Sequence, residues 1–177
     1  MTTVVHKFYA KHLFLKRYFE EKREISLAQD IEDTFRKALA LAAGSYFEVE
    51  ITNALEGFVK AKSGNNEMLV NFVKNKALNR QYHTFFKWDS SNANTFFGLL
   101  GEDFKDRMTK KSATDPLLKD AIKNFIELGE LRNKAAHQNF AAFVTDKTSE
   151  EIMKAFELAS AFLDTIRKEL SDHNLKD

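Results

Sequence analysis

A short run from Glu127 to Phe140, ELGELRNKAAHQNF, holds the residues whose types and spacing best suit chemistry. Arg132 and Asn133 precede His137 by five and four positions. An imidazole titrates near neutral pH and can accept or donate a proton, which makes it a general acid or base. A guanidinium offers a planar, permanently charged donor fork that suits phosphate. These three residues are therefore the candidate site.

If residues 127–140 form a helix, the neighbours of His137 can contribute to its chemistry. Asn133 lies four residues before the histidine and hence on the same face, where its amide can orient the imidazole or hold a substrate oxygen. Ala135 and Ala136 remove bulk between the two ends of the motif. Such small side chains let a second helix or a substrate backbone come close.

Arg132 and His137 do not share a face of an ideal helix, because an offset of five residues rotates the chain by about 140°. The long arginine side chain can span part of that angle. The rest requires a loosened last turn, or two copies of the motif meeting across a dimer. A simpler alternative is an exposed helix end without a substrate. Basic side chains such as Arg132, Lys134 and His137 are common there, because they interact favourably with the negative C-terminal end of the helix dipole. From spacing alone, both interpretations stay open.

The rest of the chain offers little competing chemistry. It has no cysteine, which excludes disulfides, thiolate metal sites and cysteine nucleophiles and suits a reducing compartment. His6 and His12 are six residues apart, about 240° around a helix, so they cannot bind one metal from one face. No metalloprotease, phosphate-loop or nucleophile-elbow signature occurs. We therefore predict no metal and no cofactor.

Composition predicts a single soluble domain over residues 1–177. The chain is 44% hydrophobic, enough to bury a core without metal or disulfide support. No window approaches ~18 uncharged apolar residues, so we expect a cytoplasmic protein without a membrane span. With 27 basic and 26 acidic residues the formal charge is +1, which excludes an overall positive field for coating nucleic acid. Any nucleic-acid contact must be local.

The elements that position the motif are predicted to be helices. Apolar residues recur three and four apart, and the chain has one proline and six glycines. We expect an all-α bundle of about five to seven helices. The 17 phenylalanines occupy mainly apolar helical positions, which favours core packing over base stacking. Helices are predicted at about 4–23, at 26–62, in two short segments after 66, at 93–110, at 116–137, and from 148–151 to about 171.

Local signals refine three of these helices. The helix at about 4–23 has an apolar face and an opposite face that carries lysines. The helix at 26–62 begins with a capping box of Ser26 and Gln29 and is either continuous or hinged near Gly44. A second capping box, TSEE, begins the last helix.

The motif and its surroundings resemble a known family. LRNKAAHQNF is similar to the motif of the HEPN superfamily, an arginine, usually followed by a polar residue, with a histidine four to six positions after the arginine. Three further segments resemble the RiboL-PSP-like branch of that superfamily: ALALAAGSYFEVEITNAL its early helix, NANTFFGLLGEDFK its middle segment, and TSEEIMKAFELASAFLDTIRKEL its closing helix. The resemblance covers about Leu27 to Leu170, and the helix at about 4–23 is less clearly covered.

The resemblance implies a metal-independent endoribonuclease of toxin, abortive-infection or antiviral defence systems, with two protomers packing their motif helices together. His137 would take the proton from an RNA 2'-hydroxyl or protonate the leaving 5'-oxygen, leaving a 2',3'-cyclic phosphate. Arg132 would stabilise charge on the phosphoryl oxygens, and Asn133 would orient the histidine or the phosphate. Lys134 would hold the RNA backbone. Glu48 would join the site or be a solvated helix charge.

The implied partners are RNA, a second protomer that completes a composite active site, and an antitoxin or sensor protein. The sequence departs from some HEPN toxins at one position. Those toxins carry a tyrosine two positions after the histidine, which their partner modifies, and here that position is Asn139. Regulation through that tyrosine is therefore not expected. Two alternatives remain, a non-catalytic dimeric module that binds RNA, nucleotide or a partner protein, and a purely structural bundle. The sequence does not define the RNA target.

Overall fold

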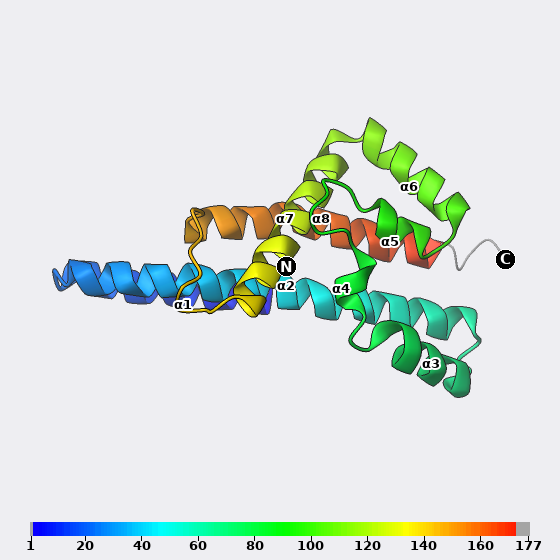
Figure 1. Ribbon diagram of the computed structural model, residues 1–177, viewed down its shortest axis with the longest axis horizontal. Coiled ribbons are helices and arrows are strands. Elements are labelled where there is room, and N and C mark those ends of the chain that lie inside the picture. The colour runs from blue at the N-terminus through cyan, green and yellow to red at the C-terminus, as the bar shows by residue number, and fades with distance from the viewer. Residues whose placement is uncertain (1, 173–177) are drawn as a thin grey trace. The chain divides into compact units, whose positions relative to one another are not determined.

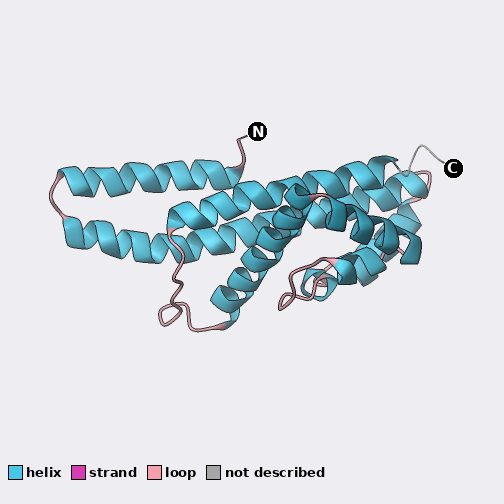
Figure 2. Ribbon diagram, turned by 90° about the horizontal axis from the view of Figure 1, so that it is seen from above, coloured by secondary structure: helices cyan, strands magenta, loops and turns pink. Residues whose placement is uncertain are grey.

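The chain is all-α in the part that the structure describes. The computed structural model describes residues 2–172, and every regular element in that range is a helix (Figure 2). The described residues form eight α-helices and one π-helical turn, against about five to seven helices predicted, and six of the α-helices have seven residues or more. Among the described residues, no helix combines the length and the hydropathy that a membrane crossing requires.

The chain falls into two compact units. The motif unit comprises the chain up to Tyr46 together with Leu128–Glu157, and the aromatic unit comprises Phe47–Glu127 and the chain from Leu158 onward. Three long helices contribute a segment to each: α2 (Ile25–Lys62), α7 (Pro116–His137) and α8 (Ser149–Asp172). The expectation of one domain over residues 1–177 stays a prediction.

In the motif unit, α1 (Val4–Glu21) and the first part of α2 form an antiparallel helical hairpin (Figure 1). Thr3 caps α1, because its hydroxyl accepts from the backbone N–H of His6 while the His6 ring bonds the Thr3 backbone in return. A turn with Arg23 in the left-handed region (φ 62°) connects the two helices. The predicted range of 4–23 is therefore correct to within two residues.

The helix α2 is continuous, so the alternative of a hinge near Gly44 is wrong. Gly44 is buried inside α2, and Arg132 of α7 packs directly against it. The predicted capping box of Ser26 and Gln29 is also wrong. The helix already begins at Ile25, with the N–H of Ala28 bonded to the carbonyl of Glu24, and both predicted cap residues lie inside it.

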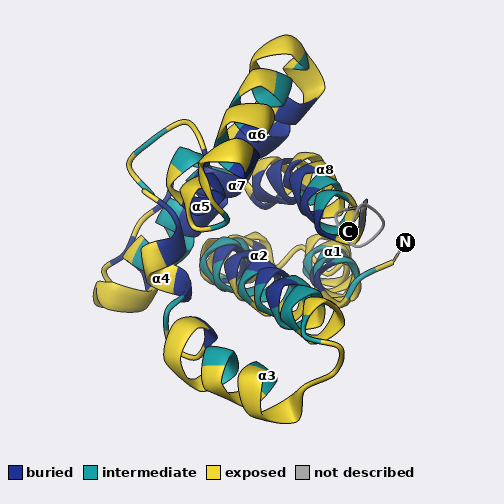
Figure 3. Cartoon of the chain, turned by 90° about the vertical axis from the view of Figure 1, so that its right-hand side faces the viewer, coloured by how far each residue is buried: buried dark blue, intermediate teal, exposed yellow. Residues whose placement is uncertain are grey.

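The aromatic unit contains the short helices. These are α3 (Glu67–Val73), a π-helical turn (Lys74–Leu78), α4 (Tyr82–Phe85), α5 (Asn94–Gly98) and α6 (Glu102–Thr114). The single helix predicted at 93–110 is wrong, because Gly101 adopts a φ of 100° that breaks the helical path between α5 and α6. Glycine reaches that region without steric cost. Figure 3 shows α3 exposed along most of its length, and none of its residues is buried.

The helices that carry the motif and close the chain begin as predicted. Asp115 caps α7, with its carboxylate accepting from the backbone N–H groups of Leu117 and Leu118 at 3.0 and 3.1 Å. The capping box of α8 is confirmed: the Thr148 hydroxyl accepts from the N–H of Glu151 at 3.1 Å, and the Glu151 carboxylate accepts from the N–H of Thr148 at 2.8 Å.

Candidate active site at the end of α7

The candidate motif occupies the last turns of α7 in the motif unit. Lys134 pairs with Glu130, one turn earlier, at 2.7 Å, which supports the helix at this point. The helix ends at His137, because Asn139 turns the chain: its side-chain oxygen accepts from the N–H of Ala141 and its carbonyl accepts from that of Phe143. The motif therefore lies on a regular helix that stops immediately after the histidine.

The stem of Arg132 packs directly against Gly44 of α2. A Cβ atom placed on Gly44 would lie 2.6 Å from both Cβ and Cγ of Arg132, closer than packed atoms allow. The glycine is therefore required for the arginine stem to lie where it does. At the other end of the side chain, Nη1 donates to Oδ1 of Asn133 at 3.1 Å. Stem and guanidinium are thus both positioned before any substrate arrives.

His137 is exposed at the end of the helix. Within the described part of the chain, its ring makes no hydrogen bond and no ion pair, so both ring nitrogens are open to a bound molecule. The helix stays regular through His137, which removes the alternative of a loosened last turn. Arg132 and His137 consequently point in directions about 140° apart. The two side chains could therefore act on one substrate only if a second copy of the chain contributes one of them or if the substrate spans both.

The other predicted site residues have different surroundings. Asn133 orients Arg132, a contact that the sequence did not indicate. Lys134 is exposed and paired with Glu130, with which an incoming phosphate would compete. Glu48 is half-buried on α2 one turn beyond Gly44, but it belongs to the aromatic unit, so its part in the site stays a prediction.

The two alanines of the motif differ in exposure. Ala135 is buried inside the motif unit and Ala136 is exposed. Ala135 therefore serves the packing of this chain. Ala136 is the one that presents a small side chain to an approaching molecule.

Two residues of α2 that sequence reasoning missed shape the site. Gly44 admits Arg132, and Lys37 holds the chain that leaves α7: its Nζ donates to the carbonyls of Phe140 and Ala141 at 3.3 and 3.4 Å. Lys37 and Gly44 are seven residues apart, two helical turns, and so lie on one face. The available signal was the small-residue run ALALAAG, which indicates a helix face that another helix can approach.

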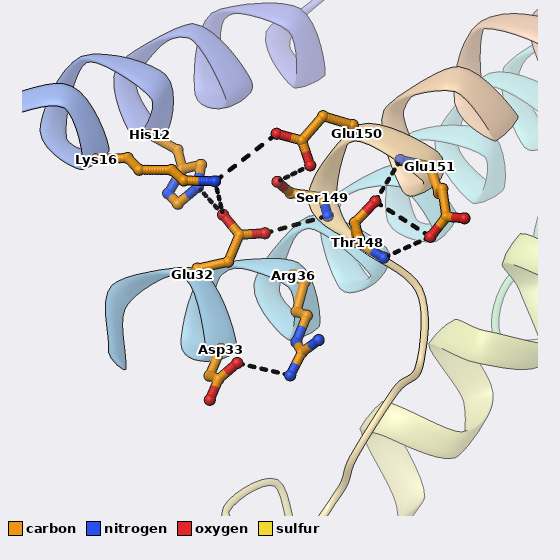
Figure 4. A network of polar contacts seen from close by, with 9 residues as sticks. All are labelled: His12, Lys16, Glu32, Asp33, Arg36, Thr148, Ser149, Glu150 and Glu151. Atoms are coloured by element: carbon orange, nitrogen blue, oxygen red, sulfur yellow. Dashed lines mark hydrogen bonds and ion pairs between the residues drawn. The ribbon is translucent and has the colours of Figure 1, made fainter. Parts of the chain in front are cut away.

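A polar cluster in the motif unit fixes α1 and the start of α8 to α2 (Figure 4). The carboxylate of Glu32 lies 2.7 Å from Nε2 of the buried His12 ring and forms an ion pair with Lys16 at 3.4 Å. It also accepts a hydrogen bond from the backbone N–H of Ser149 at 3.2 Å. Burial raises the pKa of Glu32, but the hydrogen bonds from Ser149 and His12 and the charge of Lys16 outweigh it and lower the pKa from 4.5 to about 2. The carboxylate is therefore ionised at every physiological pH.

The site contains no evident metal-binding set. Among residues 2–172, no group of three or more histidine, cysteine, aspartate and glutamate side chains lies close enough to hold a metal ion. The chemistry available at the end of α7 is thus that of an open imidazole, a positioned guanidinium and nearby amide and ammonium groups.

The sequence matches a protein-family model described as RiboL-PSP-HEPN over residues 15–172. The matched range includes the whole candidate motif and extends over both units. It begins within α1, earlier than the Leu27 boundary expected from the sequence, and leaves Val4–Phe14 of that helix outside. No curated protein and no solved structure matches the chain.

Proposed function

The chain belongs to the RiboL-PSP-HEPN family, and on that premise we propose that it is a metal-independent endoribonuclease. HEPN domains are generally associated with ribonuclease activity. The observation that carries the proposal is that the last two turns of α7 hold both an exposed imidazole, His137, and a guanidinium that Gly44 and Asn133 position in advance. A positioned cation that needs no rearrangement during the reaction is the more effective stabiliser of developing charge.

The proposed reaction is an internal transfer within RNA. A neutral His137 takes the proton from a 2'-hydroxyl, whose oxygen then forms a bond to the adjacent phosphorus. The bond from phosphorus to the 5'-oxygen breaks, and that oxygen takes up, as it leaves, the proton that His137 accepted. Arg132 stabilises the negative charge that builds on the non-bridging oxygens. The products carry a 2',3'-cyclic phosphate and a 5'-hydroxyl, and no metal is needed for either proton transfer.

We propose that two protomers complete the site. Arg132 and His137 diverge on one regular helix, so a partner's motif helix would supply the missing direction. The exposed Ala136 offers little resistance to such an approach. Asn133 orients Arg132 in this arrangement, and Lys134 exchanges Glu130 for the RNA backbone. The part of Glu48 in the site stays a prediction.

The second candidate is a non-catalytic dimeric module that binds RNA, nucleotide or a partner protein. The observation in its favour is the same divergence, because one copy of the chain does not bring imidazole and guanidinium onto one face. A binding module would retain the positive charge of Arg132 and Lys134 without needing proton transfer from His137. Its RNA binding would therefore survive loss of the imidazole.

The test is cleavage of a mixed RNA pool in EDTA by wild type and His137→Ala, with product ends determined. His83→Ala is the matched control, since His83 is also exposed but lies in the aromatic unit. We expect cyclic-phosphate ends from the wild type and from the control, and a loss of at least about 100-fold for His137→Ala. RNA binding by a folded wild type that never cleaves would favour the binding module.

We further propose that the nuclease is a cytoplasmic toxin or a defence effector that is held in check by a partner protein. A toxin of this kind would arrest growth on expression, and His137→Ala would relieve the arrest while His83→Ala would not. A wild type that cleaves only when a further protein is added would identify that protein as an activating sensor. Arrest by all three proteins alike would contradict the toxin role of the active site.

A further inference from the structure

The solvent-facing side of α1 carries basic and aromatic side chains in one line. We call this the α1 stripe: Lys7, Lys11, Phe14 and Tyr18 of the helix, and Lys22, which is its C-cap residue. Successive members are four, three, four and four residues apart, the spacing that aligns side chains along one helix face. All five are exposed, with 71% of Phe14 and 48% of Tyr18 accessible to solvent. A phenylalanine so exposed departs from the core packing expected of this residue type.

The opposite face of α1 is the one that holds the helix in the motif unit. Its buried His12 contacts Glu32 and stacks on Phe35 of α2 with ring centroids 3.7 Å apart. His6 packs against Phe156 of α8 at 5.6 Å. Figure 2 shows α1 running along the outer side of α2. The α1 stripe is therefore free of any role in fixing the helix.

Four of the five stripe residues lie in a segment whose charge differs from that of the chain, and the fifth, Lys22, follows Glu20 and Glu21. Residues 1–19 contain lysine and arginine at four positions and no aspartate or glutamate, although the whole chain has a net charge of +1. Lys16 is neutralised by Glu32 and Glu150. Lys7 and Lys11, by contrast, form no ion pair within the part of the chain that the structure describes. Their charge is available to an anionic partner.

We propose that the α1 stripe is a second RNA-binding surface, which holds a single strand of the substrate away from the active site. Lysines that alternate with exposed rings suit this ligand, since the cations meet phosphates while bases stack on the aromatic faces. From Lys7 to Lys22 the stripe runs about 22 Å at 1.5 Å per residue, which accommodates several nucleotides. The choice of RNA rests on the proposed nuclease function.

The first part of this surface is an addition to the family region. The family match begins at residue 15, so Lys7, Lys11 and Phe14 lie outside it. A surface in this position would adapt a nuclease domain to its own substrate without altering the active site. The local contact also accords with the near-neutral charge of the chain, which excludes binding through an overall field.

Two other occupants fit the stripe less well. A helix lying in a membrane surface needs one continuous apolar face with cations at its edges. The stripe has lysines in line with its two rings at both ends, so its apolar part is limited to Phe14 and Tyr18 and is not one continuous apolar face. A symmetric contact with a second copy would bring the stripe lysines of both chains into one interface, and like charges at close range repel.

The proposal is tested by fluorescence anisotropy with a labelled single-stranded RNA in the His137→Ala background, where the RNA stays intact. The charge-reversed pair Lys7→Glu/Lys11→Glu should raise Kd at least about tenfold and reduce the slope of log Kd against log salt by about two. The pair Phe14→Ala/Tyr18→Ala should raise Kd at least about fivefold, with an unchanged salt slope.

Matched controls carry the same changes elsewhere. Lys110→Glu/Lys119→Glu alters net charge equally at exposed positions without an ion pair in the described residues, and Phe72→Ala removes another exposed ring. Equal weakening by stripe and control variants, or none by either, overturns the proposal. So does stripe-dependent binding to phosphatidylserine vesicles, or a dimer that becomes a monomer, if RNA binding is unchanged.

Failure of this proposal is distinguishable from failure of the nuclease. If neither wild type nor His137→Ala cleaves RNA while the stripe variants lose binding, the α1 stripe stands and the nuclease falls. If His137→Ala abolishes cleavage while the stripe variants bind RNA normally, the nuclease stands and the stripe falls.

Discussion

Aromatic rings are in contact in both units, but the motif unit also has a helix contact at a glycine and buried polar residues. In the aromatic unit, the ring of Phe125 lies within about 5 Å of those of Phe47, Phe86 and Phe162, with centroid distances of 5.1, 4.9 and 4.9 Å. In the motif unit, the contact of α2 with α7 depends on Gly44, which lacks a side chain. The buried polar residues of the described chain all lie in the motif unit, namely His12, Thr145 and Ser149.

The two kinds of contact have different effects: one adds mainly to the folding free energy, and the other fixes the position of Arg132. Large rings remove much apolar area from water, so the aromatic unit contributes strongly to the folding free energy. A glycine contact contributes little area but sets the separation of two helices to within one methyl group. A polar cluster adds direction, because its hydrogen bonds hold only in a narrow geometry. The motif unit thus suits the placement of Arg132, and substitutions should damage the two units in different ways.

The largest effect should come from the aromatic unit. Phe125→Ala removes a fully buried ring that contacts several others, and we expect a loss of about 3 to 5 kcal/mol in the free energy of unfolding. Urea denaturation followed by circular dichroism measures it. Phe72→Ala, at an exposed phenylalanine of the same unit, is the control and should change stability by less than about 0.5 kcal/mol. Equal losses for the two would contradict the role of the aromatic core.

An intermediate effect should come from the polar cluster of the motif unit. Glu32 has a folded-state pKa of about 2 against an ordinary value of 4.5, so its ionised form stabilises the folded chain. Glu32→Gln removes that charge, and we expect a loss of about 2 kcal/mol near pH 7 after solvent screening. Asp33→Asn is the control, because Asp33 is exposed and pairs only with Arg36 among the described residues.

The sign of the pH dependence distinguishes this effect from a packing defect. As the pH falls from about 4.5 towards 2, the unfolded chain binds a proton at this position before the folded chain does. The stabilisation by Glu32 is therefore complete above about pH 5 and is lost as the pH approaches 2. Urea midpoints of wild type and Glu32→Gln should converge through that window. A constant difference between them would contradict the electrostatic origin.

Local patterns in the sequence predicted most of the helices. Apolar spacing and caps gave α7 at residues 116–137, and the TSEE capping box gave the start of α8, because both signals act within a few residues. Gly101 was missed because the run around it has a helical period, and only the backbone conformation of one glycine interrupts it. Gly44 was open to both readings for the same reason, since a glycine neither requires nor forbids a helix.

The residues of the candidate site could be predicted from the sequence, but the residues that hold them in place could not. The divergence of Arg132 and His137 follows from helix geometry and was predicted. The contact of Gly44 with Arg132, and that of Lys37 with the chain after α7, join residues about a hundred positions apart. A periodic pattern identifies which face of α2 is small or charged, but it does not identify which helix packs on that face.

The smallest effect on stability is also the most specific test of positioning. Gly44→Ala should gain helix propensity, by about 1 kcal/mol, but its Cβ would displace the stem of Arg132, at a cost of about 1 to 3 kcal/mol. We expect a net loss of about 1 kcal/mol and a larger loss of RNA cleavage, because the guanidinium moves with its stem.

Gly57→Ala, on the same helix, has nothing within 4 Å of the added atom and should stabilise the chain by about 0.5 to 1 kcal/mol with unchanged cleavage. The two variants share one chemical change, one helix and one gain in propensity, so a difference in sign isolates the contact with Arg132. Unfolding and cleavage assays on both variants measure it. If Gly44→Ala were as stable and as active as Gly57→Ala, α2 would not position the arginine, and the contrast between the units would be one of composition alone.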